Sequence, residues 1–165
     1  MAEIAQGLRL LVDFEVDFVV VGGVAVSARG SSQVTYDLDV CYSRDRANLM
    51  RLTDALRSVN ATLRGAPKNL PFRLDAETLE RGLNFTFDTD IGSLDILGEV
   101  QGVGQYGECL EGSDQFELFG KNCRVLSLQK LIAAKKSAGR TKDLMVLPEL
   151  EAILEQQNLR RLTES

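Results

Sequence analysis

Two aspartates separated by one residue, Asp37 and Asp39, form the first cluster in this 165-residue chain whose spacing suggests chemistry. On a strand, residues two apart point to the same face, so both carboxylates would project together while Leu38 enters the core. Negative charges this close repel each other unless a cation lies between them, and Mg²⁺ prefers carboxylate oxygens. The pair therefore predicts a divalent-metal site, while the alternative of two solvated aspartates at a strand end stays open.

A third aspartate, Asp95, alternates with apolar neighbours and so points to the opposite face of its strand from them. If that strand lies beside the one with Asp37 and Asp39, three carboxylates converge, a set suited to one or two Mg²⁺ ions against a nucleoside triphosphate. An edge-strand aspartate facing water is the alternative. Asp88 and Asp90 repeat the spacing but flank an expected turn, where aspartate is common for local hydrogen-bonding reasons, so we assign them no metal.

The dipeptide Gly22-Gly23 joins a buried apolar run to a short helical stretch of small residues. Glycine lets backbone N–H groups approach a ligand without a Cβ, and the start of a helix carries partial positive charge, so phosphate could bind there. A tight turn from strand to helix is the structural alternative, because the full glycine patterns of nucleotide-binding loops are absent.

Lys135 falls on the apolar face of an expected helix, since its spacing continues that of Leu128, Leu131 and Ile132. A lysine on such a face either extends past the edge of the core or points at an anion. The most basic stretch of the chain follows it, with Lys136, Arg140 and Lys142. This stretch predicts a phosphate-binding cluster or, alternatively, a solvated helix end whose cations suit the helix dipole.

Hydrophobic periodicity and turn signals predict the elements that must position these residues. Helices are expected at 3–16, 24–28, 44–60 with Ser43 as N-cap, 127–137 with Gly139 ending it, and 141–159 with a kink or restart at Pro148. Strands are expected at 18–21, 34–42, 83–88, 93–97, 116–119 and 123–126, the last four as two hairpins. Residues 61–81 are mixed, and the glycine-rich 98–114 is expected to be a loop or lid.

Interleaved helices and strands with two hairpins predict the α/β class, a mixed sheet with flanking helices. The length predicts one domain, 1–165, made of a catalytic core 1–140 and a C-terminal helical segment 141–165.

Composition excludes several classes of chemistry. The chain has no histidine, which removes histidine-based nucleophile pairs, histidine general bases and histidine metal sites. Its three cysteines form neither a CxxC pair nor a disulfide framework, so we expect a reducing, cytoplasmic location. A net charge of −5 argues against a duplex-DNA footprint. No signal peptide is recognisable, and the longest apolar run is far too short for a membrane span.

The order in which these motifs follow one another along the chain indicates a family more specifically than any single motif does. The stretch VVVGGVAVSARGSSQVTYDLDV at 19–40 resembles the opening motif of the polymerase-β-like nucleotidyltransferase superfamily. It is most similar to that of the small bacterial nucleotidyltransferases grouped with the AbiEii toxins. The stretch LSLQKLIAAKKSAGRTKDL at 126–144 resembles the terminal motif of the same group.

The resemblance implies the polymerase-β-like fold and a Mg²⁺-dependent (or Mn²⁺-dependent) transfer of a nucleoside monophosphate from a nucleoside triphosphate to a hydroxyl of RNA, tRNA or protein. It implies that Asp37, Asp39 and Asp95 bind the metal, with Asp95 helping to activate the hydroxyl. It also implies a nucleotide-binding set consisting of Gly22, Gly23, Thr35, Lys135 and Lys142. An antitoxin protein would be a partner if the toxin role applies.

Two departures from the group's pattern support an alternative function. Position 23 is Gly where a serine is common, and position 33 is Gln where the small group usually has Arg. A catalytically silent nucleotide-binding or partner-binding module on the same fold therefore stays open. So does a structural or oligomeric protein in which the Asp37–Asp39 pair is only a surface feature.

Overall fold

The structure is a computed structural model and describes residues 2–67 and 69–164. Seven helices in this part of the chain are α1 (Ala2–Asp13), α2 (Gly22–Ala28), α3 (Arg46–Ser58), α4 (Ala76–Arg81), α5 (Tyr106–Leu110), α6 (Leu128–Ala138) and α7 (Thr141–Glu164). The strands are β1 (Phe18–Val21), β2 (Leu38–Tyr42), β3 (Thr62–Leu63), β4 (Asn84–Thr89), β5 (Gly92–Leu97), β6 (Glu99–Val100), β7 (Gly104–Gln105), β8 (Asp114–Leu118) and β9 (Lys121–Val125). No helix in the described ranges is long and apolar enough to cross a membrane.

Seven of the strands form one mixed sheet in the order β3-β4-β5-β2-β1-β9-β8. Strand β2 runs antiparallel to β1 and parallel to β5, and β1 runs parallel to β9. The two hairpins expected from the turn signals are present, with β4–β5 next to β2 and β8–β9 next to β1. The short strands β6 and β7 form a separate ribbon. The predicted class, α/β with a mixed sheet and flanking helices, is confirmed.

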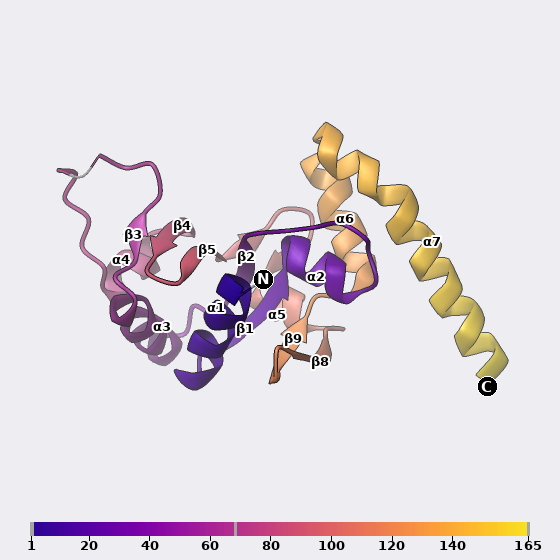
Figure 1. Cartoon of the computed structure of the whole chain (residues 1–165), viewed down its shortest axis with the longest axis horizontal. Coiled ribbons are helices and arrows are strands. Elements are labelled where there is room, and N and C mark those ends of the chain that lie inside the picture. The colour runs from indigo at the N-terminus through magenta and orange to yellow at the C-terminus, as the bar shows by residue number, and fades with distance from the viewer. Residues whose placement is uncertain (1, 68, 165) are drawn as a thin grey trace.

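The central strands divide the molecule into two layers. Leu38 and Val40 of β2 are buried on one face, where α1 packs against them. Asp39 and Cys41 alternate with them and face the other side, toward α5 and α6. Figure 1 shows α3 and α4 at one end of the molecule and α6 and α7 at the other, with the second half of α7 extending away from the sheet. One face of β2 therefore packs on α1, and the other carries Asp39 near the start of the strand and the buried Cys41 after it.

Several sequence-based boundaries are corrected by the structure. The strand expected from 34 begins at Leu38, because residues 34–37 form a loop outside the sheet. Asp45, not Ser43, is the N-cap residue of α3. The expected lid 98–114 contains β6, β7 and α5, whose start carries a capping box between Gln105 and Glu108. In residues 98–114 the capping hydrogen bonds at the start of α5 therefore outweigh the glycine content, which favours a loop.

The C-terminal helices follow their predicted local signals. Ser127 caps α6 by accepting a hydrogen bond from the Lys130 N–H, and Gly139 ends it with φ 65°, in the left-handed region. Helix α7 is continuous through Pro148, so the expected restart there does not occur. Together these helices place Lys135, Arg140 and Lys142 across a cleft from Asp39, near the start of the central strand β2.

Candidate active site

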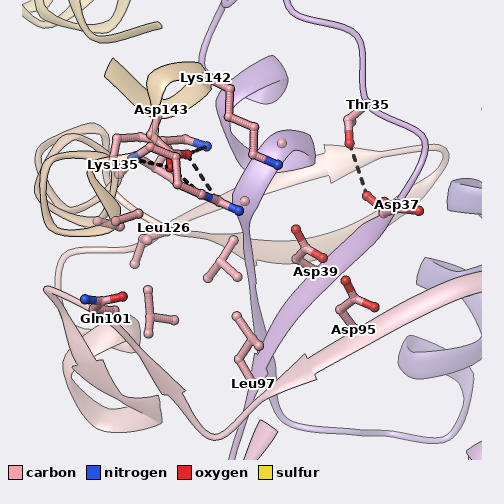
Figure 2. A pocket seen from close by; sticks show the side chains of 18 of the residues that line it. Thr35, Asp37, Asp39, Asp95, Leu97, Gln101, Leu126, Lys135, Lys142 and Asp143 are labelled. Atoms are coloured by element: carbon pink, nitrogen blue, oxygen red, sulfur yellow. Dashed lines mark hydrogen bonds and ion pairs between the residues drawn. The ribbon is translucent and has the colours of Figure 1, made fainter. Parts of the chain in front are cut away.

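Strand register brings two of the predicted aspartates together. Val21 lies opposite Asp39 in the β1–β2 pair, and Asp39 lies opposite Asp95 in the β2–β5 pair. Residues in register across a sheet share a face, so both carboxylates project to the same side. Figure 2 shows Asp39 and Asp95 pointing toward one another. The adjacency of these two strands, on which the convergence prediction depended, is therefore present.

Asp39 is in an environment that penalises its negative charge. Burial raises its pKa to about 7, helped by the contact with the Asp95 carboxylate and by the charges of Asp95 and Asp37, while Lys135 acts in the opposite direction. A site that disfavours a second negative charge gains from a divalent cation, which would relieve the repulsion.

Asp37 has a different position from the pair. It is exposed and precedes β2, and its backbone carbonyl accepts a hydrogen bond of 3.3 Å from the Thr35 hydroxyl. Within residues 2–67 and 69–164, no three His, Cys, Asp or Glu side chains form a group that could hold a metal by themselves. The described part of the chain thus presents the carboxylate pair Asp39–Asp95 with Asp37 nearby. Metal binding by all three residues stays a prediction.

Gly22 and Gly23 are the first residues of α2 and lie against the same site. Gly22 has φ 63°, and a Cβ there would collide with Oδ2 of Asp39. A Cβ on Gly23 would lie 2.7 Å from the Thr35 Oγ1. Both glycines are therefore required by the close packing of backbone against Asp39 and Thr35. Their predicted contact with phosphate remains a separate prediction.

These residues line a cleft of about 640 Å³. The cleft has an acidic wall, a basic wall and an apolar wall. The acidic wall consists of Asp37, Asp39 and Asp95, the basic wall of Lys135, Arg140, Lys142 and the carboxylate Asp143, and the apolar wall of Leu97, Val100, Leu126 and Leu131. Figure 2 shows Lys135, Lys142 and Asp143 on one side of this cleft and the three predicted aspartates on the other.

The basic wall is organised by a buried carboxylate that sequence reasoning missed. Asp143 has a side chain only 1% exposed and accepts from Arg140 Nε at 2.6 Å and from Lys135 Nζ at 3.4 Å. The Arg140 hydrogen bond lowers the pKa of Asp143, against the effect of burial, and Lys135 lowers it further. The inward position predicted for Lys135 is confirmed, but this lysine faces both Asp143 and the cleft. An acidic residue in the first turn of the expected helix, three residues after Arg140, was the available signal, since its side chain also accepts from the Arg140 N–H.

The acidic wall also has an unforeseen partner. Arg64, from the end of β3, donates to Asp95 Oδ1 at 3.0 Å through its terminal nitrogen and to Asp88 Oδ1 at 3.1 Å through Nε. Nothing in the local sequence around Arg64 indicates this contact, because β3 and β5 meet only through β4.

The donor set suits a hard divalent cation. Mg²⁺ binds through one or two carboxylates, keeps several waters and completes its shell with substrate phosphates. The adjacent carboxylates of Asp39 and Asp95, with cations lying opposite them across the cleft, match this requirement. Mg²⁺ or Mn²⁺ at this pair is therefore chemically consistent with the residues present.

Comparison with known proteins identifies the fold. No family model and no curated protein matches the sequence. Among solved structures, the lincomycin-bound lincosamide antibiotic adenylyltransferase LnuA is similar with a TM-score of 0.59 at 14% identity, covering 92% of this chain and 96% of that one. The antibiotic-resistance factor ANT(2'')-Ia is similar with a TM-score of 0.54 at 14% identity, covering 98% of this chain and 92% of that one. The chain has the polymerase-β-like nucleotidyltransferase fold.

Proposed function

We propose that this chain is a divalent-metal-dependent nucleotidyltransferase that moves a nucleoside monophosphate from a nucleoside triphosphate to a hydroxyl group. The observation that carries the proposal is the opposition of the Asp39–Asp95 pair and the cations of α6 and α7 across one cleft. Its volume of about 640 Å³ is within the usual range for sites that bind small molecules.

The nucleotide-binding roles follow from the positions of the residues in the cleft. Lys142 and Lys135 would contact the phosphates from the basic wall, and Thr35 would contact them from the loop before β2. The backbone of Gly22 and Gly23, which no Cβ shields, would approach the same phosphates. Support for these roles comes from the fact that all five residues line one cleft.

The acidic wall would hold the metal and orient the acceptor. Asp39 and Asp95, with Asp37 completing the set, would bind Mg²⁺ or Mn²⁺. When bound, the metal would neutralise charge on the phosphate oxygens. The acceptor hydroxyl forms a bond to the α-phosphorus as the bond to pyrophosphate breaks. Pyrophosphate leaves with the electron pair, and Asp95 assists removal of the hydroxyl proton. Such a transfer depends on positioning and charge neutralisation, so it needs no histidine.

The acceptors that we propose are RNA, tRNA or protein. LnuA, whose structure contains lincomycin, is an adenylyltransferase of a small molecule, so a low-molecular-weight acceptor forms a further arm of the test. The motif resemblance to the AbiEii group supports a toxin role with an antitoxin partner. This role predicts that expression in a bacterial host slows growth and that Asp39→Asn removes the effect.

Labelling with each of the four α-³²P nucleoside triphosphates and Mg²⁺ tests the proposal. Cell RNA, cell protein and a small-molecule extract are offered separately as acceptors. The wild-type chain is expected to label one fraction, and Asp39→Asn to reduce that labelling at least about a hundredfold, as loss of transition-state charge stabilisation does. Asp54→Asn is a matched control because Asp54 is an exposed aspartate on α3 outside the cleft.

Equal labelling by Asp39→Asn and wild type would refute the assignment of Asp39. Calorimetry with each triphosphate, with and without Mg²⁺, separates the remaining alternatives. Binding without transfer would indicate the catalytically silent module. Failure to bind any triphosphate would contradict both functions.

A further inference from the structure

A row of residues in register crosses the sheet from Arg64 to Asp95 and Asp39, the acidic pair. The Arg64 N–H donates to the Thr86 carbonyl at 2.9 Å, Thr86 lies opposite Asp95, and Asp95 lies opposite Asp39. Residues in register share a face, so Arg64 projects on the same side as the two carboxylates. Adjacent strands are about 4.8 Å apart, and only a long side chain can cross Thr86 to reach Asp95.

The Arg64 guanidinium donates hydrogen bonds to Asp95 and to two further acceptors, the Phe87 carbonyl and Asp88. One terminal nitrogen binds Asp95 Oδ1 at 3.0 Å and the Phe87 carbonyl at 3.0 Å, and Nε binds Asp88 Oδ1 at 3.1 Å. The Arg64 side chain is 34% exposed and that of Asp95 is 19% exposed. A guanidinium has several donors in a rigid plane, so it can bind two carboxylates and a carbonyl at once. A lysine could supply the charge but not this bridging geometry.

The same Asp95 carboxylate also contacts Asp39, so it lies between a cation on one side and a carboxylate on the other. Arg64 therefore fixes the orientation of Asp95 and offsets part of the charge of the acidic pair. Arg64 does not itself line the cleft, which separates it from the residues expected to contact the nucleotide.

We propose that Arg64 is a positioning residue that holds the Asp95 carboxylate in the orientation needed for the transfer reaction. This inference rests on the proposed nucleotidyltransferase function. It makes two predictions of different kinds. Removing the guanidinium lets Asp95 rotate, which slows turnover. Removing its positive charge makes the acidic pair more negative, which tightens binding of a cation.

The test uses Arg64→Met, which keeps an aliphatic stem without the charge, and Arg64→Lys, which keeps the charge without the bridge. Arg46→Met is the matched control, because Arg46 forms an ion pair at 3.2 Å with Glu80, both partners being more than half exposed and outside the cleft. Calorimetry measures Mg²⁺ binding to each protein alone. Labelling rates are measured over a range of triphosphate concentrations with the acceptor fraction that the wild type labels.

For Arg64→Met we expect Mg²⁺ affinity to rise about tenfold, the effect of removing a unit charge a few ångströms from a divalent ion. We expect kcat to fall at least about tenfold while KM for the triphosphate stays within about twofold. Arg64→Lys should keep wild-type Mg²⁺ affinity and recover part of kcat, and Arg46→Met should match the wild type in both measurements. Lower stability alone would not produce tighter metal binding with slower turnover.

Unchanged Mg²⁺ affinity and kcat in Arg64→Met would overturn the proposal, as would a rise in KM with kcat unchanged. If Arg64→Met does not fold, Arg64→Lys decides, since a wild-type kcat in that variant contradicts a need for the bridge. If the wild-type chain labels nothing, the proposed function fails, while the Mg²⁺ affinities still decide whether Arg64 acts on the acidic pair.

Discussion

Gly22 shows how strongly single residues constrain this site. Its φ of 63° is in the left-handed region, and the absence of a side chain leaves room for Oδ2 of Asp39. The glycine is thus needed twice, for backbone conformation and for the position of the carboxylate. Gly120, in the β8–β9 turn, has φ 81° but no atom within 4 Å of a Cβ placed on it. The two glycines therefore separate the two effects.

Gly22→Ala is expected to lower the free energy of unfolding by about 2–4 kcal/mol, the sum of left-handed strain and overpacking. Gly120→Ala should lose only about 1 kcal/mol, because it has the strain without the collision. Urea denaturation measures both. Equal losses in the two variants would mean that Asp39 does not occupy the space beside Gly22.

Asp143 links stability to pH. Its pKa lies below the ordinary 3.8 in the folded chain, chiefly because Arg140 binds the carboxylate, although burial opposes the shift. A lowered folded-state pKa stabilises the fold at pH values above 3.8, and this contribution is lost as the pH falls through the folded-state value. Asp143→Asn should therefore cost about 2–3 kcal/mol at pH 7, leaving Lys135 and Arg140 unpaired.

The same variant should differ little from wild type at a pH below the folded-state pKa of Asp143, where the wild-type side chain is neutral as well. Thermal unfolding at a series of pH values measures the difference, with Asp54→Asn as the exposed control. A pH-independent difference between wild type and Asp143→Asn would show that packing, and not charge, explains the loss.

At the scale of elements, the two halves of α7 have different roles. Its first turns contribute Asp143, Val146 and Leu150 to the buried interior and hold the loop before β2 through Glu149, which accepts from the Ser32 N–H at 2.8 Å. Residues 158–164 are exposed. A division of the chain at residue 140 would therefore separate residues 1–140 from three buried side chains of α7 that pack on them.

Removal of residues 156–165 is expected to change the melting temperature by less than about 3 °C, because the deleted part of the helix buries little. Removal of residues 141–165 should cost at least about 5 kcal/mol, since it takes two apolar side chains out of the core and unpairs the cations of the basic wall. Circular dichroism on heating measures both. A stable 1–140 fragment would contradict a structural role for α7 in the core.

At the scale of the whole molecule, all three cysteine thiols are buried in the core. Cys41 on β2 and Cys109 on α5 are distant in sequence, yet they are neighbours in the core and both are fully buried. The contact with Cys109, followed by burial, raises the pKa of Cys41, and burial raises that of Cys123 to about 11. All three cysteines are free thiols in the structure.

The native chain is accordingly expected to react with a thiol-specific disulfide reagent only as fast as it unfolds, since all three thiols are buried. Burial limits access even to Cys109, whose pKa is lowered by its contact with Cys41. In denaturant all three thiols of the sequence should react at once. Absorbance titration measures the number of reactive thiols. Rapid reaction of Cys41 or Cys109 in the native state would show that α5 opens readily over β2.

The sequence by itself determined what neighbouring residues can decide. Apolar periodicity predicted most helices and strands, and Ser127 and Gly139 marked the ends of α6, because caps and periodicity depend on groups within one or two turns. Only the tertiary structure decided which strands lie together, and therefore that Asp39 faces Asp95, that Arg64 reaches Asp95 across β4, and that Asp143 pairs with Lys135. Such contacts join distant segments, and they form only when the packing of the whole sheet outweighs the entropy of closing the intervening loops.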